Sequence, residues 1–397
     1  MRRLVRFLSL ALVVVGIFWV GLWWYAESRL ALAVDQMTTL LRSHGWTVAH
    51  GAVIRGTSPF RVEVLVSDLR LTPPVTNGPA PTLAIPALDM TVRPGTPFTL
   101  DLAPASTWRL ALADGPSATL HFGSIAATER FDPASLLNGS DNPLRAGSFH
   151  ATDLRIDSQN TNFTLLSIAA ISVDDTRNPR AGTAETAFSL RESVSGLALS
   201  PIFTTLGDLP FGGKLGRLSL DLAVSGPAAE LPAGLAGALA PQINRPARPL
   251  AGMTPADFMA IWQRTGPALH RWARAGGHGS LGVRLVVGPL DATGKGEFGF
   301  DSGTQPRGQM HLVADGFGAA LGTISTHYPG LVGGISALTA AASPFLVRGP
   351  KGGQRLAVTF SLAHGALTAN GTHLVTVPPL VWPDAPPPPA GAPKPKG

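Results

Sequence analysis

The stretch that decides the fold class is Arg217-Leu218-Ser219-Leu220-Asp221-Leu222-Ala223-Val224. Its apolar side chains recur at every second position, so one face of a strand would meet a core and the other would meet water. This alternation is typical of an antiparallel sheet that is covered on one side. A second run has the same form, with apolar residues at Leu281, Val283, Leu285 and Val287. The two runs predict a sheet with one apolar face.

Shorter strand patterns extend from these two runs toward both ends of the chain. The expected strands are residues 61–71, 83–92, 98–102, 108–113, 119–122, 148–156, 217–224, 280–287, 309–314, 356–362 and 366–377. Within 61–71 the apolar positions change from even to odd numbers near Asp68, which predicts a β-bulge there. Glycine (45) and proline (36) are frequent, so turns must be many and strands short. The sequence predicts an α+β fold, mostly antiparallel β, in which an elongated curved sheet carries a few packed helices.

Residues 7–25 form an apolar run without a charged side chain. As a helix this run would be about 28 Å long, close to the ~30 Å hydrocarbon core of a bilayer. It is preceded by Arg2, Arg3 and Arg6, and its far end carries Trp19, Trp23, Trp24 and Tyr25. Positive charge before a span favours the cytoplasm, and aromatic side chains favour the membrane interface. We therefore expect a single-pass inner-membrane anchor, with the amino terminus cytoplasmic and the body periplasmic. A cleaved signal peptide is the alternative, because Ala31-Leu32-Ala33 resembles a cleavage site.

Two amphipathic helices are expected. The first, residues 26–43, carries an apolar stripe of Leu30, Ala33, Val34, Met37, Leu40 and Leu41. This stripe would pack on the following domain, with dimerisation or contact with the bilayer as alternatives. The second helix begins with Thr254 as N-cap and Pro255 at its first position, is interrupted at Gly266-Pro267 and ends at Gly276.

The pattern divides the chain into segments of different character. They are a basic cytoplasmic segment (1–6), a transmembrane anchor (7–25), an amphipathic helix (26–43), a first β-rich lobe (44–227), a flexible connection (228–253), a helix with a second β-rich lobe (254–382) and a disordered proline-rich tail (383–397).

Motifs for chemistry are weak. The chain has no cysteine, which excludes disulfides, thiolate metal sites and cysteine nucleophiles. His270 and His278 are the nearest approach to a metal pair, but a third ligand with suitable spacing is missing. Gly212-Gly213-Lys214-Leu215 lacks the Ser or Thr of a phosphate loop. We therefore predict a protein that is not an enzyme, with no catalytic residue, no cofactor and no metal.

Two further observations bear on partners. The net charge of +6 is compatible with anionic lipid headgroups or with an ordinary solvated surface, and we find no nucleic-acid motif. Asn138-Gly139-Ser140 and Asn370-Gly371-Thr372 fit the glycosylation acceptor, although Asn-Gly is first of all a turn signal.

Several short motifs are shared with one bacterial family. They are Gly56-Thr57-Ser58-Pro59-Phe60-Arg61-Val62, Trp272-Ala273-Arg274-Ala275-Gly276-Gly277, Val283-Arg284-Leu285-Val286-Val287-Gly288-Pro289-Leu290, Gly294-Lys295-Gly296, Gln305-Pro306-Arg307-Gly308 and Pro378-Pro379-Leu380-Val381-Trp382. With these motifs the sequence resembles domain-of-unknown-function family 2125. It departs from the family pattern before Gly288, where Val287 replaces a tryptophan. The family implies no catalytic residues. The layout is also similar to AsmA-like envelope proteins, whose long open sheets present an apolar face to lipid.

Three hypotheses for function follow. The first is a non-enzymatic envelope protein that binds or conveys membrane lipid along an apolar sheet face, for which the candidate residues are Leu218, Leu220, Leu222, Val224, Leu281, Val283, Leu285 and Val287. The same side chains could instead form an ordinary closed core. The second hypothesis is a membrane-tethered scaffold or assembly factor that binds an envelope protein. The third is a periplasmic hydrolase whose site has no recognisable motif. The oligomeric state stays open.

Overall fold

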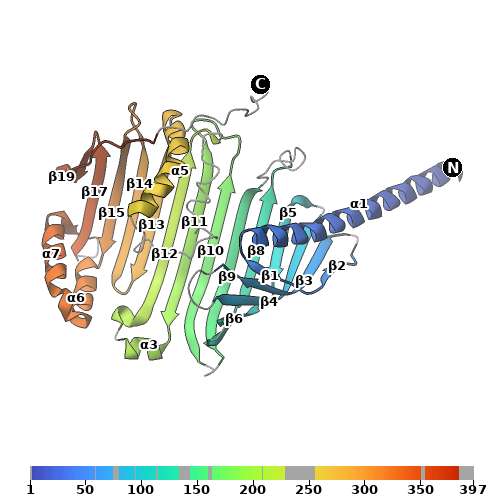
Figure 1. Ribbon diagram of the computed structural model, residues 1–397, viewed down its shortest axis with the longest axis horizontal. Helices are drawn as coiled ribbons and strands as arrows, with labels where there is room; N and C mark the ends of the chain where they lie inside the picture. The colour runs from blue at the N-terminus through green and yellow to red at the C-terminus, as the bar shows by residue number, and fades with distance from the viewer. Residues whose placement is uncertain are drawn as a thin grey trace. The chain divides into compact units, whose positions relative to one another are not determined.

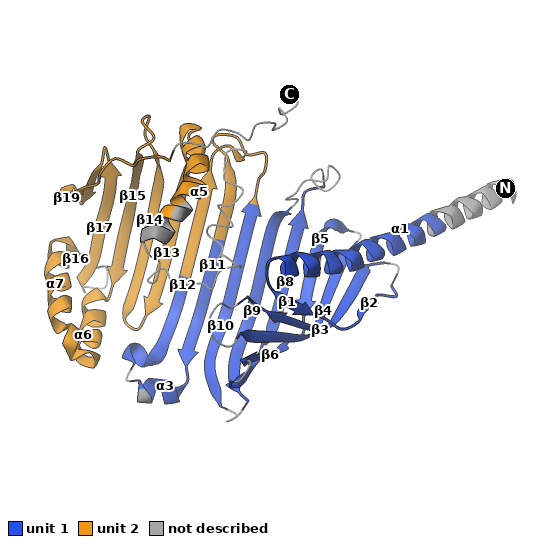
Figure 2. Ribbon diagram, in the orientation of Figure 1, with its two compact units in different colours: residues 1–176, 191–218, 243–246 blue, residues 177–190, 219–242, 247–397 orange. Residues whose placement is uncertain are grey.

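The computed structural model describes residues 2–58, 60–74, 80–93, 95–112, 115–133, 144–159, 163–207, 209–228, 255–349 and 354–383, with side chains except at 2–16, 206, 255–258, 260, 261 and 264. Figure 2 shows two compact units: unit 1 is Met1–Thr176, Arg191–Leu218 and Ile243–Pro246, and unit 2 is Arg177–Leu190, Ser219–Gln242 and Ala247–Gly397. The expected connection 228–253 lies outside the described residues from 229 onward, and the expected tail 383–397 does so from 384 onward. The chain is α+β with mostly antiparallel strands, as predicted.

Unit 1 contains one long helix and a meander of strands (Figure 1). Its elements are α1 (Arg2–Ser43), β1 (Thr47–Ala49), β2 (Val53–Arg55), β3 (Val62–Thr72), β4 (Pro81–Arg93), β5 (Thr96–Pro104), β6 (Thr107–Leu112), β7 (Ser117–His121), β8 (Ser124–Phe131), β9 (Leu144–Ser158) and β10 (Thr164–Arg177). Both β1 and β2 pair with β3, and β3 pairs with β4. Strand β4 pairs with both β5 and β6. Strand β5 then pairs with β8 and β6 pairs with β7, and β7 and β8 each pair with β9. Finally β9 pairs with β10.

A line of irregular pairings crosses the strands of unit 1. The predicted change of phase at Asp68 is present: its φ is +48°, and the register passes from Ser67–Ala87 to Leu69–Ile85 without pairing Asp68 or Pro86. It differs from the expected β-bulge, because each strand leaves one residue unpaired and the register is the same on both sides. A proline suits such a position because it has no N–H for the ladder. The same interruption recurs at Asp153 (φ +49°), which is left unpaired with Ala169 between the pairs Thr152–Ala170 and Leu154–Ile168. We call this feature the bulge line, and its members are Asp68, Pro86, Asp153, Ala169 and Gly196.

Helix α1 runs without a break through the apolar run (7–25) and the expected amphipathic helix (26–43). It packs on β1, β2 and β3 through a stripe that includes Leu30, Val34 and Leu41. Other members of the expected stripe are exposed, for example Met37 (56%). The helix ends as predicted at Gly45, whose φ of +82° suits a C-cap and whose N–H donates to the Arg42 carbonyl at 2.9 Å.

One charged residue is buried in the contact between α1 and the strands. Glu27 is 1% exposed, and its Oε1 accepts a hydrogen bond from the Glu63 N–H at 3.4 Å. Burial raises the pKa of Glu27, while this hydrogen bond and Arg55 oppose the rise. Gly56 permits the approach, since a Cβ at this position would lie 3.2 Å from Glu27 Oε1.

Three strands contribute residues to both units: β10, through its last residue Arg177, β11 (Thr186–Leu199) and β12 (Lys214–Ser225). Between β11 and β12 along the chain lie α3 (Pro201–Leu206) and the 3-10 helix η1 (Pro210–Gly213).

Unit 2 consists of a helix, an antiparallel sheet and a helical hairpin inserted between two of its strands (Figure 1). The elements are α5 (Pro255–Arg274), β13 (His278–Val287), β14 (Leu290–Phe300), β15 (Pro306–Asp315), α6 (Phe317–His327), η4 (Pro329–Leu331), α7 (Val332–Ala342), η5 (Ser343–Phe345), β16 (Leu346–Arg348), β17 (Gln354–Ala363), β18 (Ala366–Ala369) and β19 (Thr372–Thr376). The strands pair in the order β13–β14–β15–β17–β18–β19, and β16 also pairs with β17.

Three features of unit 2 differ from the sequence-based expectations. Helix α5 begins at Pro255 as predicted but runs without interruption through Gly266 and Pro267; both are buried, and packing outweighs the poor helix propensity of this pair. Thr254, the expected N-cap, lies outside the described residues. The expected strand 366–377 is a hairpin of β18 and β19, and helices α6 and α7 were not predicted.

The turn of the β18–β19 hairpin is the Asn370-Gly371 pair. Both residues have positive φ, +47° and +83°, which is the conformation of a two-residue type I′ turn. The Asn370 side chain also bonds to β17: its Oδ1 accepts from the Thr359 N–H at 2.7 Å, and its Nδ2 donates to the Ala357 carbonyl at 3.3 Å. This residue is therefore part of the sheet edge, and the turn interpretation of Asn-Gly is confirmed at this position.

Candidate functional site

The register of unit 2 sorts its side chains onto two contrasting sheet faces. Residues paired directly across neighbouring strands point to the same side. We define the apolar face by three rows across β13, β14, β15 and β17, namely Leu285–Ala292–Ala314–Leu356, Val283–Gly294–Leu312–Val358 and Leu281–Gly296–Met310–Phe360. Each of these positions is apolar or glycine, so this side of the sheet is hydrophobic over four strands.

The opposite face is polar. Its rows include Arg284–Thr293, Lys295–His311–Thr359 and Glu297–Gln309–Ser361. Two ion pairs lie on it: Arg284 with Asp291 at 2.8 Å and Arg355 with Asp315 at 2.6 Å. Such side chains favour water, so the contrast between the faces gives the sheet one wet side and one side that must be covered.

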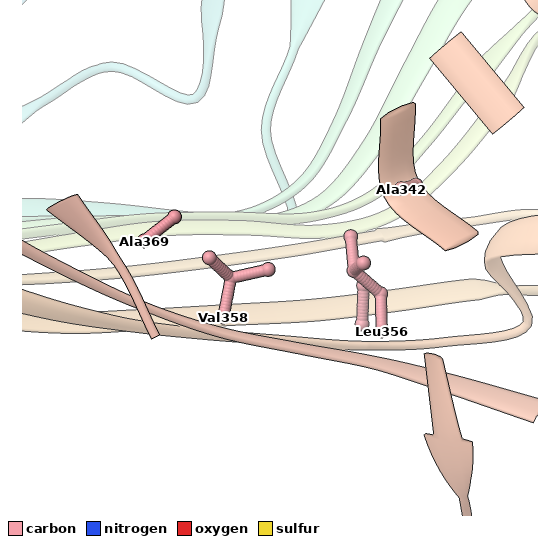
Figure 3. Close-up of a cluster of buried hydrophobic side chains, with 5 residues drawn as sticks. Ala342, Leu356, Val358 and Ala369 are labelled. Atoms are coloured by element: carbon pink, nitrogen blue, oxygen red, sulfur yellow. The ribbon is translucent and has the colours of Figure 1, made fainter. Parts of the chain in front are cut away.

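The α6–α7 hairpin covers one end of the apolar face. Ala342 of α7 belongs to a buried cluster with Ala314, Leu356, Val358 and Ala369. In Figure 3, the side chains of Leu356, Val358 and Ala369 point to the side of the strands on which Ala342 lies. Because Ala314 and Leu356 are 3% and 8% exposed, this end is an ordinary packed core.

Helix α5 packs near the end of the face that lies beyond the third row. Its Trp272 is 2% exposed and meets Phe300 of β14 edge-on, with ring centroids 5.9 Å apart. Two glycines admit the indole ring, since a Cβ on Gly226 would lie 2.7 Å from Trp272 Nε1 and a Cβ on Gly277 would meet the ring itself. A second packed region therefore closes this end.

The carboxyl-terminal segment joins this second region. Trp382 stacks on His270 of α5 with a centroid distance of 4.7 Å, and it also contacts Trp262 and Phe300. Its Nε1 donates to the Thr304 carbonyl at 3.2 Å. Burial, assisted by nearby Arg274, lowers the pKa of His270. The family-like ending of the chain thus has a structural role in unit 2.

The β13 side of the apolar face is less buried than the side beneath the α6–α7 hairpin, where Leu356 and Val358 of β17 are 8% and 5% exposed. Leu281, Val283 and Leu285 of β13 are half-buried, as are Leu312 and Met310 of β15. In β14 the middle positions are glycines, and Met310 and Val283 lean over Gly294, where a Cβ would lie 2.6 Å and 2.9 Å from them. The half-buried leucine and valine side chains of β13, beside these two closed regions, form the best candidate contact surface for an apolar ligand in unit 2.

The structure places the eight predicted lipid-facing residues unequally. Leu281, Val283, Leu285 and Val287 are half-buried on β13 and share one side of the strand. A Cβ built on Gly282 would lie 3.3 Å from the Asp221 side chain of β12, so Gly282 and Asp221 are on the same side of the sheet. Their neighbours along each strand point to the other side, so Leu220 and Leu222 lie on the apolar side together with Leu281 and Val283. Leu218 belongs to unit 1 and is 47% exposed, whereas Val224 is 2% exposed and lies in a closed core.

Sequence reasoning missed the contributions of β14, and it did not connect β15 and β17 to the candidate surface. The available signal was the short connection between the two strands: Gly288-Pro289 is a two-residue turn, and such a turn places the following strand beside the preceding one. The glycines of β14 hid the strand pattern, because glycine is depleted in strands.

The predicted topology determinants all lie in α1. Arg2, Arg3 and Arg6 are in the helix, but their side chains are outside the described residues, as are those of residues 7–16 of the expected span. Trp19, Trp24 and Tyr25 are exposed, whereas Trp23 is half-buried and its Nε1 donates to the Arg61 carbonyl at 3.0 Å. A search of the described residues finds no helix that is both long and apolar enough to span a bilayer.

Two open pockets lie side by side in unit 1 and share His121. One, of about 430 Å³, follows the bulge line past Phe122, Asp153 and Gly196; the other, of about 490 Å³, is lined by polar side chains that include Asp157. His121 Nε2 lies 3.7 Å from Asp157 Oδ2, and its Nδ1 lies 3.4 Å from Thr107 Oγ1. Both contacts are long, and they join His121 of β7 to side chains of the neighbouring strands β9 and β6.

The histidines considered as metal ligands have other contacts. His270 stacks on Trp382 and its Nε2 lies 3.3 Å from Thr304 Oγ1, while His278 Nδ1 lies 3.1 Å from the Gly276 carbonyl. In the described part of the chain no group of three or more His, Cys, Asp or Glu side chains is arranged to hold a metal ion.

Comparison with known proteins gives one match. The model of the family described as "Uncharacterized protein conserved in bacteria (DUF2125)" matches residues 23–378. The resemblance inferred from the short motifs is therefore confirmed. Searches of curated proteins and of solved structures gave no match.

Proposed function

We propose that this chain, a member of the bacterial DUF2125 family, is a membrane-anchored envelope protein that binds lipid acyl chains on the apolar face of unit 2. One observation carries the proposal: the β13 side of this face is half-buried, while the parts of the face beneath α6–α7 and beside Trp272 of α5 are closed. Acyl chains suit such a surface because it offers hydrocarbon contacts without polar partners.

The anchor supplies the ligand. In this proposal α1 enters the inner membrane through residues 7–25, with Arg2, Arg3 and Arg6 in the cytoplasm and the two units in the periplasm. A lipid surface is then always close to the body of the protein. The polar face of unit 2, with its Arg284–Asp291 pair, would stay in water.

The absence of native cysteine allows a direct test by thiol accessibility. Leu285→Cys is placed on the half-buried part of the apolar face, Ala314→Cys beneath the α6–α7 hairpin as a protected reference, and His311→Cys on the polar face as a reactive reference. The full chain is held in a lipid-free amphipathic polymer, so that no bilayer occupies the face, and its reaction with a polar maleimide is followed with and without added short-chain phosphatidylglycerol.

The expected result is that Leu285→Cys reacts in the absence of the added lipid and is protected by it, while the His311→Cys rate does not change. If Leu285→Cys is as unreactive as Ala314→Cys without lipid, the face is a closed core and the proposal is wrong. If it reacts but the lipid gives no protection, the face is open and lipid is not its ligand.

A scaffold role is the second candidate, favoured by a different surface. Residues 316–347 contain no Asp, Glu, Lys or Arg, although α6 and α7 lie partly in solvent. Leu331, Val332 and Leu338 are 55%, 45% and 50% exposed. Native mass spectrometry of the chain extracted from membranes separates the two roles: retained phospholipid supports the first, and a stoichiometric protein partner that is lost in Leu338→Glu supports the second.

A further inference from the structure

The loop between β2 and β3 is fixed to α1 at the end of the apolar run. Trp23 Nε1 donates to the Arg61 carbonyl at 3.0 Å, and one turn further along the helix the buried Glu27 carboxylate accepts from the Glu63 N–H at 3.4 Å. The first contact is two residues before the last residue of the apolar run, Tyr25. At 1.5 Å per residue, this places the loop within about 3 Å of that end along the helix axis.

This loop carries an exposed phenylalanine. Phe60 is 75% exposed, more than Phe18 (71%) or Ile17 (68%) on the apolar part of α1 itself. Exposing a phenylalanine to water is unfavourable, and here the neighbouring backbone is fixed in place by hydrogen bonds. The exposed aromatic side chain is therefore presented at a defined height beside the helix.

From this geometry we propose that Phe60 enters the same bilayer interface as α1, so that the β2–β3 loop is a second membrane contact. The inference rests on the proposed membrane anchor and is independent of lipid binding by unit 2. If residues 7–25 cross the bilayer, the helix segment around Trp23 lies at the headgroup level, and the loop bonded to it must lie there too.

The surrounding side chains fit an interface. Trp24 and Tyr25 are 59% and 55% exposed on α1, and the Arg29 guanidinium lies 5.7 Å from the Tyr25 ring centroid on the side toward the body. Aromatic rings followed by a cation match the order of acyl chains, interface and aqueous headgroups. The surface is continuous with the segment that would enter the bilayer, so the bilayer is the occupant we assign to it.

Two contacts from separate elements would restrict how the body tilts against the membrane. A single helix permits rotation about its own axis and tilt, whereas a helix and a loop beside it define a plane. Unit 1 would thus present one fixed side to the headgroups.

The test uses the full chain in vesicles of phosphatidylcholine and phosphatidylglycerol. Single cysteines are introduced as Phe60→Cys, Phe18→Cys and Leu40→Cys and labelled with an environment-sensitive fluorophore; nitroxide-bearing lipids then quench probes that reach the bilayer. Leu40 is the matched control, because it is 51% exposed on the same helix and lies about 22 Å beyond Tyr25 along the axis.

The expected result is a blue-shifted emission that is lost on addition of nitroxide lipid at positions 60 and 18, but not at position 40. Adding Trp23→Phe to Phe60→Cys removes the indole donor and should reduce the quenching at position 60 while leaving position 18 unchanged.

Three outcomes would overturn the inference. If position 60 behaves like position 40 while position 18 is quenched, the anchor stands and the loop contact is wrong. If position 18 is not quenched, the anchor itself fails. If position 60 is blue-shifted but insensitive to nitroxide lipid, a second copy or another protein covers Phe60.

Discussion

Replacing Asn370 by glycine should weaken the outer edge of unit 2 without disturbing its turn. Asn370 has a φ of +47°, which glycine adopts without strain, so Asn370→Gly isolates the side chain. That side chain connects to β17 through the Thr359 N–H at 2.7 Å and the Ala357 carbonyl at 3.3 Å. It thus occupies the edge of β17 between the segments that pair with β16 and β18.

The expected loss follows from those two bonds. Each is worth about 1 kcal/mol, and the exposed site lets water replace some of the bonding, so the free energy of unfolding should fall by about 1–2 kcal/mol. For a unit of 150–250 residues, this corresponds to a melting temperature lower by about 2–8 °C. Asn370→Asp keeps the acceptor for Thr359 but sets a carboxylate oxygen against the Ala357 carbonyl in place of the donor, so the Thr359 amide should keep its protection although the unit is destabilised.

Thermal unfolding gives the global effect, and hydrogen exchange of the β17 peptide gives the local one. In Asn370→Gly the Thr359 amide should lose protection while amides of β13 keep theirs. Unchanged protection at Thr359, or a stability within about 0.5 kcal/mol of the parent chain, would refute the bridging role.

Two more predictions concern the packing around α5. Gly277→Ala places a methyl group against the Trp272 ring and should cost about 1–3 kcal/mol by overpacking. Gly322→Ala serves as the control, because a methyl group on this residue of α6 meets no other atom, and it should stabilise the chain by about 0.5–1 kcal/mol. Chemical denaturation compares the two variants, and equal effects on the free energy of unfolding would contradict the close packing of Gly277 on Trp272. The lowered pKa of His270 means that the folded chain binds fewer protons there than the unfolded chain. The contribution of His270 to the free energy of unfolding should therefore be fully present above the ordinary histidine pKa of about 6.5 and decrease as the pH falls below it. Denaturation at a series of pH values should show that the free energy of unfolding depends less on pH in His270→Gln than in the parent chain. An identical pH dependence would exclude this histidine as the cause.

Local patterns predicted the elements in which every residue agreed with its neighbours. The strand around Leu220 alternates cleanly, and the parity change at Asp68 is visible because apolar residues flank it on both sides. The start of α5 was predictable because Pro255 fits the first helical position. In these places, local preference and tertiary packing favour the same structure.

The missed elements owe their structure to contacts that the sequence does not display. Strand β14 contains Gly294 and Gly296, whose missing side chains leave space for Met310 from the next strand. Helices α6 and α7 lack a polar stripe, so they show no helical period, although Ala342 packs on a strand that follows it in the chain. For the same reason the candidate surface was recognised on β13 but not on β15 and β17, since pairing between distant segments determines which side chains share a face.

The bulge line of unit 1 has a consequence for how related chains can differ in length. It divides each strand into two segments with separate phases of alternation, as β3 shows on either side of Asp68 and β9 on either side of Asp153. A residue gained or lost within a segment would reverse every side chain beyond it. A residue gained or lost at the line changes only the bulge and preserves both phases. Insertions and deletions within these strands should therefore accumulate at the bulge line, and their positions in other members of the family would trace it without a structure.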